Sequence, residues 1–189
     1  QQLTDSRMLQ RFALATAFFA FGHEASLEET DECGWEGDWF GILCDSESGV
    51  VYFGLGFRKG VTGTIPPELS LLTTLAHLDL DDNSLTGPIP SQLSRMTALT
   101  HLDVSHNQLL GTIPPQLSSL TALTRLSLPT NQLTGTIPAQ LAALTLLGEL
   151  YLDANQLTGT VPDELCAVGI RRFSVDRAEV ECACCPCCD

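Results

Sequence analysis

A repeat of 24 residues runs through most of this chain. Its full unit reads LxxLxxLxLxxNxLxGxIPxxL, as in LTALTRLSLPTNQLTGTIPAQL at residues 120–141. Four columns keep the same step: Asn83, Asn107, Asn131 and Asn155; Gly63, Gly87, Gly111, Gly135 and Gly159; Pro66, Pro90, Pro114, Pro138 and Pro162; Leu69, Leu93, Leu117, Leu141 and Leu165. One such unit cannot bury its own leucines, whereas stacked units bury them in a continuous core. The repeat therefore predicts a solenoid.

The LxL element of each unit predicts a short strand, because alternate side chains of a strand point to opposite faces. Its two apolar residues face the core, and the residues beside them face solvent. The inward pairs are Leu78 and Leu80, Leu102 and Val104, Leu126 and Leu128, and Leu150 and Leu152. The asparagine column is expected to hydrogen-bond backbone groups that the turns would otherwise leave unsatisfied. The Ile and Val of GxIP fill the opposite side, where proline prevents a long helix.

The repeat and its GxIP element resemble those of plant-type leucine-rich-repeat proteins, such as receptor-kinase ectodomains and polygalacturonase-inhibiting proteins. The segment ECGWEGDWFGILCD at 32–45 is similar to the N-terminal cap of that family. This cap, together with the C-terminal CxCCxCC cluster, resembles secreted leucine-rich-repeat proteins of diatom-like algae. The resemblance implies an α/β repeat solenoid, short, curved and right-handed. It has a parallel concave sheet, a convex side of 3-10 helices and turns, a helical N-cap and disulfide caps.

Three parts are expected from this likeness. Residues 1–50 form the helical cap, residues 51–165 the solenoid of about five repeats, and residues 166–189 the last strand with a Cys-rich cap. The cap helix should begin after Thr4 or Asp5 and end near Gly22. Residues 12–22 form the longest apolar stretch, and they are too few to cross a bilayer, which takes about 18 or more.

All eight cysteines lie near the two ends of the chain, which indicates disulfide caps and an oxidising compartment. We expect Cys33 to pair with Cys44, and Cys166 to pair with one member of the tail. The tail cysteines are Cys182, Cys184, Cys185, Cys187 and Cys188. Their connectivity stays open, and two alternatives remain: free thiols that bind zinc or copper(I), and palmitoylation.

The net charge of −14, from 23 acidic and 9 basic residues, argues against binding to nucleic acid or to anionic membranes. It suits cationic partners, divalent ions or simple solubility. We expect an extracellular or cell-surface protein that binds a protein, peptide or polysaccharide, with calcium bridging as one option, and that is a monomer or a weak dimer.

Outward residues of stacked strands should align in columns about 4.8 Å apart. Tyr and Arg are residue types that anchor interfaces, and carboxylates add charge selection. The predicted ligand-binding residues of the concave face are His77, Asp79, Asp81, His101, Asp103, Arg125, Tyr151, Asp153 and Arg172.

The stretch HLDVSHNQL at 101–109 holds two histidines and an aspartate, a combination that could hold a metal or share a proton. The repeat separates them, however, because His101 and Asp103 fall in adjacent columns and His106 falls at the strand end. With only Ser105 as a local nucleophile on a shallow face, we predict no enzyme, no metal site and no cofactor. We predict instead that His77, Asp79, His101 and Asp103 make ligand binding pH-sensitive.

Two alternative functions remain from the sequence. One is a structural or adhesive extracellular-matrix protein whose association depends on cations. The other rests on the LTGTIP segments, where Thr-x-Thr at 62–64, 134–136 and 158–160 resembles the ice-binding faces of some antifreeze proteins. The copies at 86–88 and 110–112 are imperfect, since Pro88 and Leu110 each replace one threonine. Threonine is also simply favoured in strands.

Overall fold

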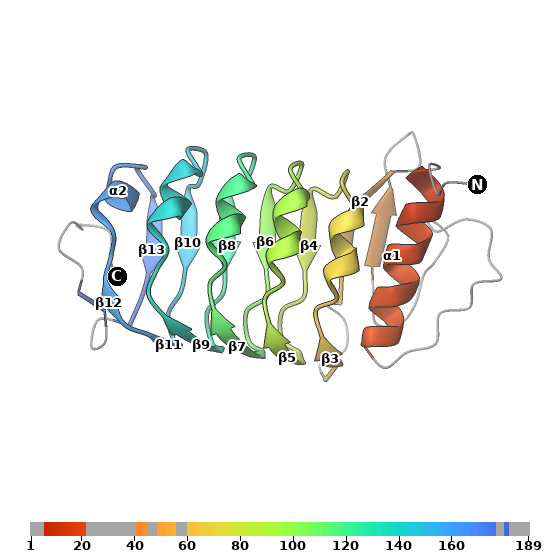
Figure 1. Ribbon diagram of the computed structural model, residues 1–189, viewed down its shortest axis with the longest axis horizontal. Helices are drawn as coiled ribbons and strands as arrows, with labels where there is room; N and C mark the ends of the chain where they lie inside the picture. The colour runs from red at the N-terminus through yellow and green to blue at the C-terminus, as the bar shows by residue number, and fades with distance from the viewer. Residues whose placement is uncertain (1–5, 22–40, 45–48, 56–59, 177–179, 182–189) are drawn as a thin grey trace.

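The computed structural model is a stack of similar coils closed at one end by a helix (Figure 1). It describes residues 6–21, 41–44, 49–55, 60–176 and 180–181. Each coil contributes one strand to a seven-stranded sheet, then one to a five-stranded sheet, then a 3-10 helix. We call these sheet B and sheet C. This is the solenoid that the 24-residue period predicts, in the arrangement that the resemblance to leucine-rich-repeat proteins implies.

Sheet B is the predicted strand ladder. Its strands, in spatial order, are β1 (Gly41–Cys44), β2 (Val50–Gly54), β4 (His77–Asp79), β6 (His101–Asp103), β8 (Arg125–Ser127), β10 (Glu149–Tyr151) and β13 (Arg172–Ser174). From β4 to β10 the strands pair in parallel between residues 24 apart, as the repeat requires. The predicted parallel sheet is confirmed, and one antiparallel strand extends it at one edge. There β1 pairs antiparallel with β2, because the connection between them is too short for a parallel crossover.

Sheet C lies along the opposite edge of the coils (Figure 1). Its strands, in spatial order, are β11 (Gln156–Leu157), β9 (Gln132–Gly135), β7 (Gln108–Thr112), β5 (Ser84–Pro88) and β3 (Thr62–Thr64). Paired residues here are 22 apart, not 24: Thr64 opposes Thr86, and Pro88 opposes Leu110. Equivalent residues of neighbouring coils are therefore displaced by two positions along the strands.

Short helices connect sheet C back to sheet B. They are η2 (Pro67–Leu71), η3 (Ser91–Arg95), η4 (Pro115–Ser119), η5 (Ala139–Ala143) and α2 (Asp163–Cys166). The residue before each is a proline of the GxIP element in extended conformation, such as Pro90 at φ −66° and ψ 126°. Proline presets this φ and offers no N–H, so the strand ends and a single helical turn follows. A small parallel pair, β12 (Gly159–Thr160) with β14 (Val180–Glu181), closes the far end.

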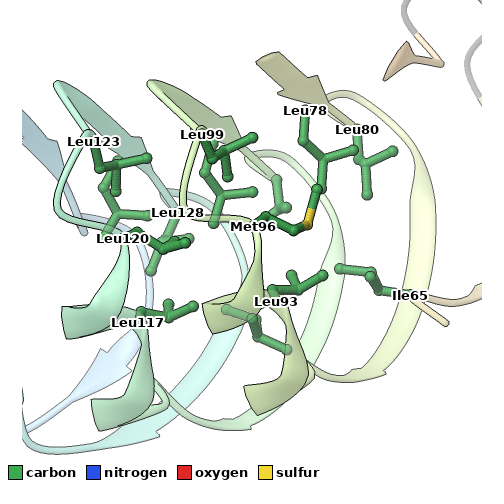
Figure 2. Close-up of a cluster of buried hydrophobic side chains, with 14 of the residues drawn as sticks. Ile65, Leu78, Leu80, Leu93, Met96, Leu99, Leu117, Leu120, Leu123 and Leu128 are labelled. Atoms are coloured by element: carbon green, nitrogen blue, oxygen red, sulfur yellow. The ribbon is translucent and has the colours of Figure 1, made fainter. Parts of the chain in front are cut away.

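The core is a continuous stack of leucines, as predicted. Figure 2 shows Leu78 of β4 and the following Leu80 close to Met96, and the set of Leu93, Met96 and Leu99 recurs one coil on as Leu117, Leu120 and Leu123. All eight residues of the LxL pairs are at most 1% exposed. Burial on this scale contributes about 25 cal/mol per Å² of apolar surface, which is why the stack needs several coils to be stable.

Helix α1 (Ser6–Ala20) covers the open end of the leucine stack (Figure 1). Ala13, Leu14 and Ala17 are fully buried, and the ring of Phe18 meets Phe53 edge-on, with centroids 6.1 Å apart. The predicted cap helix is thus confirmed. The predicted end residues Thr4, Asp5 and Gly22, as well as Cys33 and the tail cysteines, lie outside the described residues, so the disulfide pairings stay predictions. Within the described part, no helix has the length and apolarity needed to cross a membrane.

Candidate functional site

The predicted asparagine ladder joins each coil to the one before it. Asn107 accepts a hydrogen bond at Oδ1 from the N–H of Leu85 (2.9 Å), and its Nδ2 donates to the carbonyls of Leu80 (2.8 Å), Val104 and Ser105. Asn83, Asn131 and Asn155 repeat the acceptor bond at the same offset. Sequence reasoning expected bonds to the turn. The structure shows that each asparagine also bonds the backbone of the preceding coil. The ladder therefore ties the end of each sheet B strand to the start of a sheet C strand.

The predicted outward columns of sheet B are confirmed by its register. Tyr52, His77, His101 and Arg125 follow one another on adjacent strands. The rings of His77 and His101 are stacked, with centroids 4.4 Å apart, and Tyr52 lies 6.4 Å from His77. The first half of this column is therefore an aromatic strip. We call the outward side of sheet B, with its strand-end carboxylates, the sheet B face.

The Thr100 hydroxyl holds the ring of His101 in place. It lies 2.9 Å from the carbonyl of Ala76 and 2.9 Å from His101 Nδ1, so it hydrogen-bonds the imidazole as well as the preceding strand. Partial burial lowers the pKa of His101, and the neighbouring His77 and Arg125 lower it further. These surroundings favour the neutral form of the ring.

Beside the aromatic strip lies a group of carboxylates from Asp79, Asp81 and Asp103. Burial, reinforced by the nearby Asp79 carboxylate, raises the pKa of Asp81 to about 6. Burial and the same two carboxylates, Asp79 and Asp81, raise the pKa of Tyr52. Asp103 accepts from both the backbone N–H (3.0 Å) and the hydroxyl (2.6 Å) of Ser105. The charge of this half of the face therefore changes close to pH 6.

The second half of the face is a chain of ion pairs. Arg125 lies 3.5 Å from Asp103 on one side and 3.2 Å from Glu149 on the other, and Arg172 lies 3.1 Å from Glu149. The guanidinium of Arg125 also lies over the Tyr151 ring, 5.2 Å from its centroid. The predicted arginine anchors are thus paired within the face. A ligand carboxylate would have to compete with Glu149 for them.

The predicted residues do not all meet in one place. His77, Asp79, His101, Asp103, Arg125, Tyr151 and Arg172 form one continuous strip, with Asp81 beside its first half. Asp153 lies beside the second half of the strip, where its carboxylate accepts a hydrogen bond from Ser174, the register partner of Tyr151. Tyr52 and Glu149 belong to the same first outward column, as the repeat predicts, but they were not among the predicted ligand-binding residues.

The strand ends separate the polar residues of HLDVSHNQL. His106 adopts a left-handed conformation (φ 51°), as do its equivalents Asp82, Thr130 and Ala154. Ser105 is 5% exposed and donates its hydroxyl hydrogen to Asp103, so in the described structure it is paired with a carboxylate and not with a histidine base. Among the residues that the structure describes, no group of three or more His, Cys, Asp or Glu side chains is placed to hold a metal ion.

Sheet C presents a different face. None of the residues in its five strands is charged. Its exposed side chains are threonine and glutamine, apart from Pro88 and Leu110 near the centre. Beside them runs a groove of about 770 Å³, lined among others by Ile65, Pro90 and Pro114. We call the outward side of this sheet, with the groove, the sheet C face.

Comparison with known proteins places the chain in a family. The family profile described as Leucine Rich Repeat matches residues 74–96 and 98–120. A chain of the BIR3–SERK2 complex from Arabidopsis thaliana is 31% identical, with 92% of this chain and 90% of that chain covered and a TM-score of 0.70. The chain belongs to the leucine-rich-repeat family. A comparison with curated proteins yields no match.

Other solved leucine-rich-repeat structures share the fold over most of this chain. The ectodomain of the Arabidopsis thaliana receptor kinase GASSHO1/SCHENGEN3, in complex with Casparian strip integrity factor 2, is 30% identical with a TM-score of 0.81. The match covers 92% of this chain and 21% of that one, so this leucine-rich-repeat chain spans about a fifth of that ectodomain. A plant ice-binding protein is 29% identical with a TM-score of 0.66, and the match covers 93% of this chain and 64% of that chain.

Proposed function

We propose that this chain is an extracellular or cell-surface recognition domain that binds a peptide or protein through the sheet B face. One observation carries the proposal: the aromatic and charged outward side chains form an unbroken strip across β2, β4, β6, β8 and β10. Such a strip on a rigid scaffold suits recognition, because the side chains are already ordered before a ligand arrives. The chain is not an enzyme in this proposal.

The neighbours support this choice of ligand class. The GASSHO1/SCHENGEN3 ectodomain was solved with Casparian strip integrity factor 2, and BIR3 was solved with SERK2. Both are complexes of leucine-rich-repeat ectodomains with partners. A polysaccharide remains a further candidate ligand, because Tyr52 and Tyr151 offer rings on which a sugar could stack.

The first test is a binding screen with synthetic peptides of graded charge, followed by variants of the strip. Tyr151→Ala and Arg125→Ala should each raise the dissociation constant of the selected ligand about tenfold, which corresponds to about 1.4 kcal/mol of binding free energy. Asp103→Asn keeps the shape of the side chain and tests its charge. The matched control is Asp163→Asn, which removes an exposed carboxylate at α2, away from the strip. Equal affinity for all four variants would exclude the sheet B face.

A structural or adhesive role with calcium bridging is tested on the same protein. The carboxylates of Asp79, Asp81 and Asp103 would then attract calcium and link neighbouring molecules. Light scattering that rises with calcium and falls with a chelator would support adhesion. Light scattering that does not change with calcium would exclude the adhesive role.

Ice binding through the sheet C face is a second candidate function, supported by the uncharged Thr-rich strands and the ice-binding neighbour. The two-residue displacement between coils weighs against it, since it aligns Thr64 with Thr86 but then with Gln108. Leu110, 46% exposed, interrupts the array further. Absence of both thermal hysteresis and ice shaping at millimolar protein would exclude this function.

A further inference from the structure

The sheet C face has the anatomy of a protein interface. Of the six large hydrophobic side chains that are exposed among the described residues, Leu110 alone lies on this sheet. It sits on β7, the central strand of the five, directly opposite Pro88 of β5. Threonines and glutamines surround it. An apolar centre within a polar rim, depleted of charge, is the composition expected where two proteins meet.

The distribution of charge over the surface favours a second copy as the partner of the sheet C face. The chain carries a net charge of −14, so two copies repel each other across most of their surfaces. The strands of sheet C carry no charged residue, whereas sheet B presents carboxylates from β4, β6 and β10. Contact through sheet C therefore buries no like charges, and a second copy can approach there at no cost in ion desolvation.

The same face also holds a protrusion and a recess side by side. Leu110 protrudes, and the groove begins at the next residues of its own strand, Gly111 and Thr112. The floor of the groove is apolar, with Ile65 and Ile89 both 2% exposed. A twofold axis close to β7 would place Leu110 of each copy in the groove of the other. Self-complementarity of this kind is the requirement for an isologous dimer.

We propose that this protein forms a homodimer through the sheet C face, with Leu110 of each protomer seated in the groove of its partner. Five strands about 4.8 Å apart and up to five residues long give a flat area of roughly 350 Å². A standard interface buries about 800 Å² per partner, so the dimer is weak even when the groove is added. The dimer contact uses sheet C only, so the sheet B face stays open to a ligand in the dimer.

The test is sedimentation velocity on the full chain from about 1 to 500 µM, in chelator, so that calcium bridging cannot contribute. The wild type should show a reversible monomer–dimer equilibrium. Leu110→Glu places a charge in the apolar contact of both protomers and should raise the dissociation constant at least about tenfold. The matched control is Leu146→Glu, since Leu146 is 61% exposed in the turn before β10 and should leave the equilibrium unchanged.

A second pair of variants tests the groove independently of Leu110. Thr112→Arg fills its edge and should also weaken the dimer at least about tenfold, whereas Thr97→Arg, at an exposed turn residue, should not. Raising NaCl should tighten the dimer, because salt screens the repulsion between acidic copies. A monomer at every concentration, equal effects of Leu110→Glu and Leu146→Glu, or loosening by salt would each overturn the proposal.

Discussion

Sheet B and sheet C are built by the same coils, yet their outward faces differ in every respect that matters for binding. Sheet B presents stacked rings, carboxylates and a chain of ion pairs from Asp103 to Arg172. Sheet C presents hydroxyl and amide groups around one exposed leucine. The leucine core restricts only the inward residues, so the outward ones are free to diverge. The contrast matches the two tasks proposed for these surfaces, a foreign ligand on sheet B and a second copy on sheet C.

The largest expected effect concerns the element on which both sheets depend. Asn107→Ala should lower the free energy of unfolding by about 3 kcal/mol, because it leaves the Leu85 N–H without its acceptor inside the stack and removes the shorter of the two amide bonds to the Leu80 carbonyl, which keeps only the bond from Asn83. Urea unfolding measures this loss. The neighbouring Gln108→Ala, at an exposed position, should change it by less than about 0.5 kcal/mol. A loss below about 1 kcal/mol for Asn107→Ala would contradict the role of the ladder.

A second prediction separates the capped edge of sheet C from its centre. Gly63 has φ +104°, and an added Cβ would lie 1.9 Å from the carbonyl oxygen of Ala20 in α1. Gly111 has φ +81°, but its Cβ would meet only Pro88, at 3.8 Å. Gly111→Ala should therefore cost only the left-handed strain, about 1 kcal/mol, while Gly63→Ala also displaces α1 and should cost about 3 kcal/mol or more. Urea unfolding that finds equal costs would mean that α1 yields freely.

A third prediction concerns pH and applies to sheet B alone. The folded protein raises the pKa of Asp81 from 3.8 to about 6, so it binds this proton more tightly than the unfolded chain does. Protonation of Asp81 therefore stabilises the fold: its contribution to the free energy of unfolding is absent above about pH 6 and grows as the pH falls from 6 to 4. Asp81→Asn should raise the Tm at pH 7.5 and have less effect near pH 4.5.

Thermal melts across this range, with Asp163→Asn as the control, test the assignment. A Tm gain that is the same at every pH would contradict it. The sequence-based prediction of pH-sensitive ligand binding gains a direction from the same titration. A cationic ligand should bind more weakly below pH 6, because the Asp81 carboxylate loses its charge there.

The smallest expected effect on stability comes from Arg125→Ala, a substitution that tests ligand binding separately from folding. Arg125 is 39% exposed in both of its ion pairs, and exposed pairs contribute little. Arg125→Ala should change the free energy of unfolding by less than about 1 kcal/mol while still lowering the affinity of the sheet B face for its ligand. A loss of more than about 2 kcal/mol in urea unfolding would show that the ion-pair chain is structural.

Much of this architecture could be predicted because the repeat is so regular. The inward leucines, the asparagine column and the placement of His77 beside His101 all follow from the 24-residue step combined with strand alternation. The antiparallel β1 could not be predicted in the same way, because it lies in the cap, where the repeat does not apply. The pairing of Arg125 with Glu149 was also missed, since a column shows which residues are neighbours and not which of them bond.

The sequence by itself determined the solenoid, because only stacking buries a leucine every few residues along so many copies. It also determined which side chains face outward, through the alternation of the strand. Only the tertiary structure decided how those side chains combine. The register of 24 in sheet B aligns equivalent residues into a charged strip, whereas the register of 22 in sheet C displaces them and brings Leu110 opposite Pro88. That difference in register is a property of neighbouring coils packed together, which no single repeat contains.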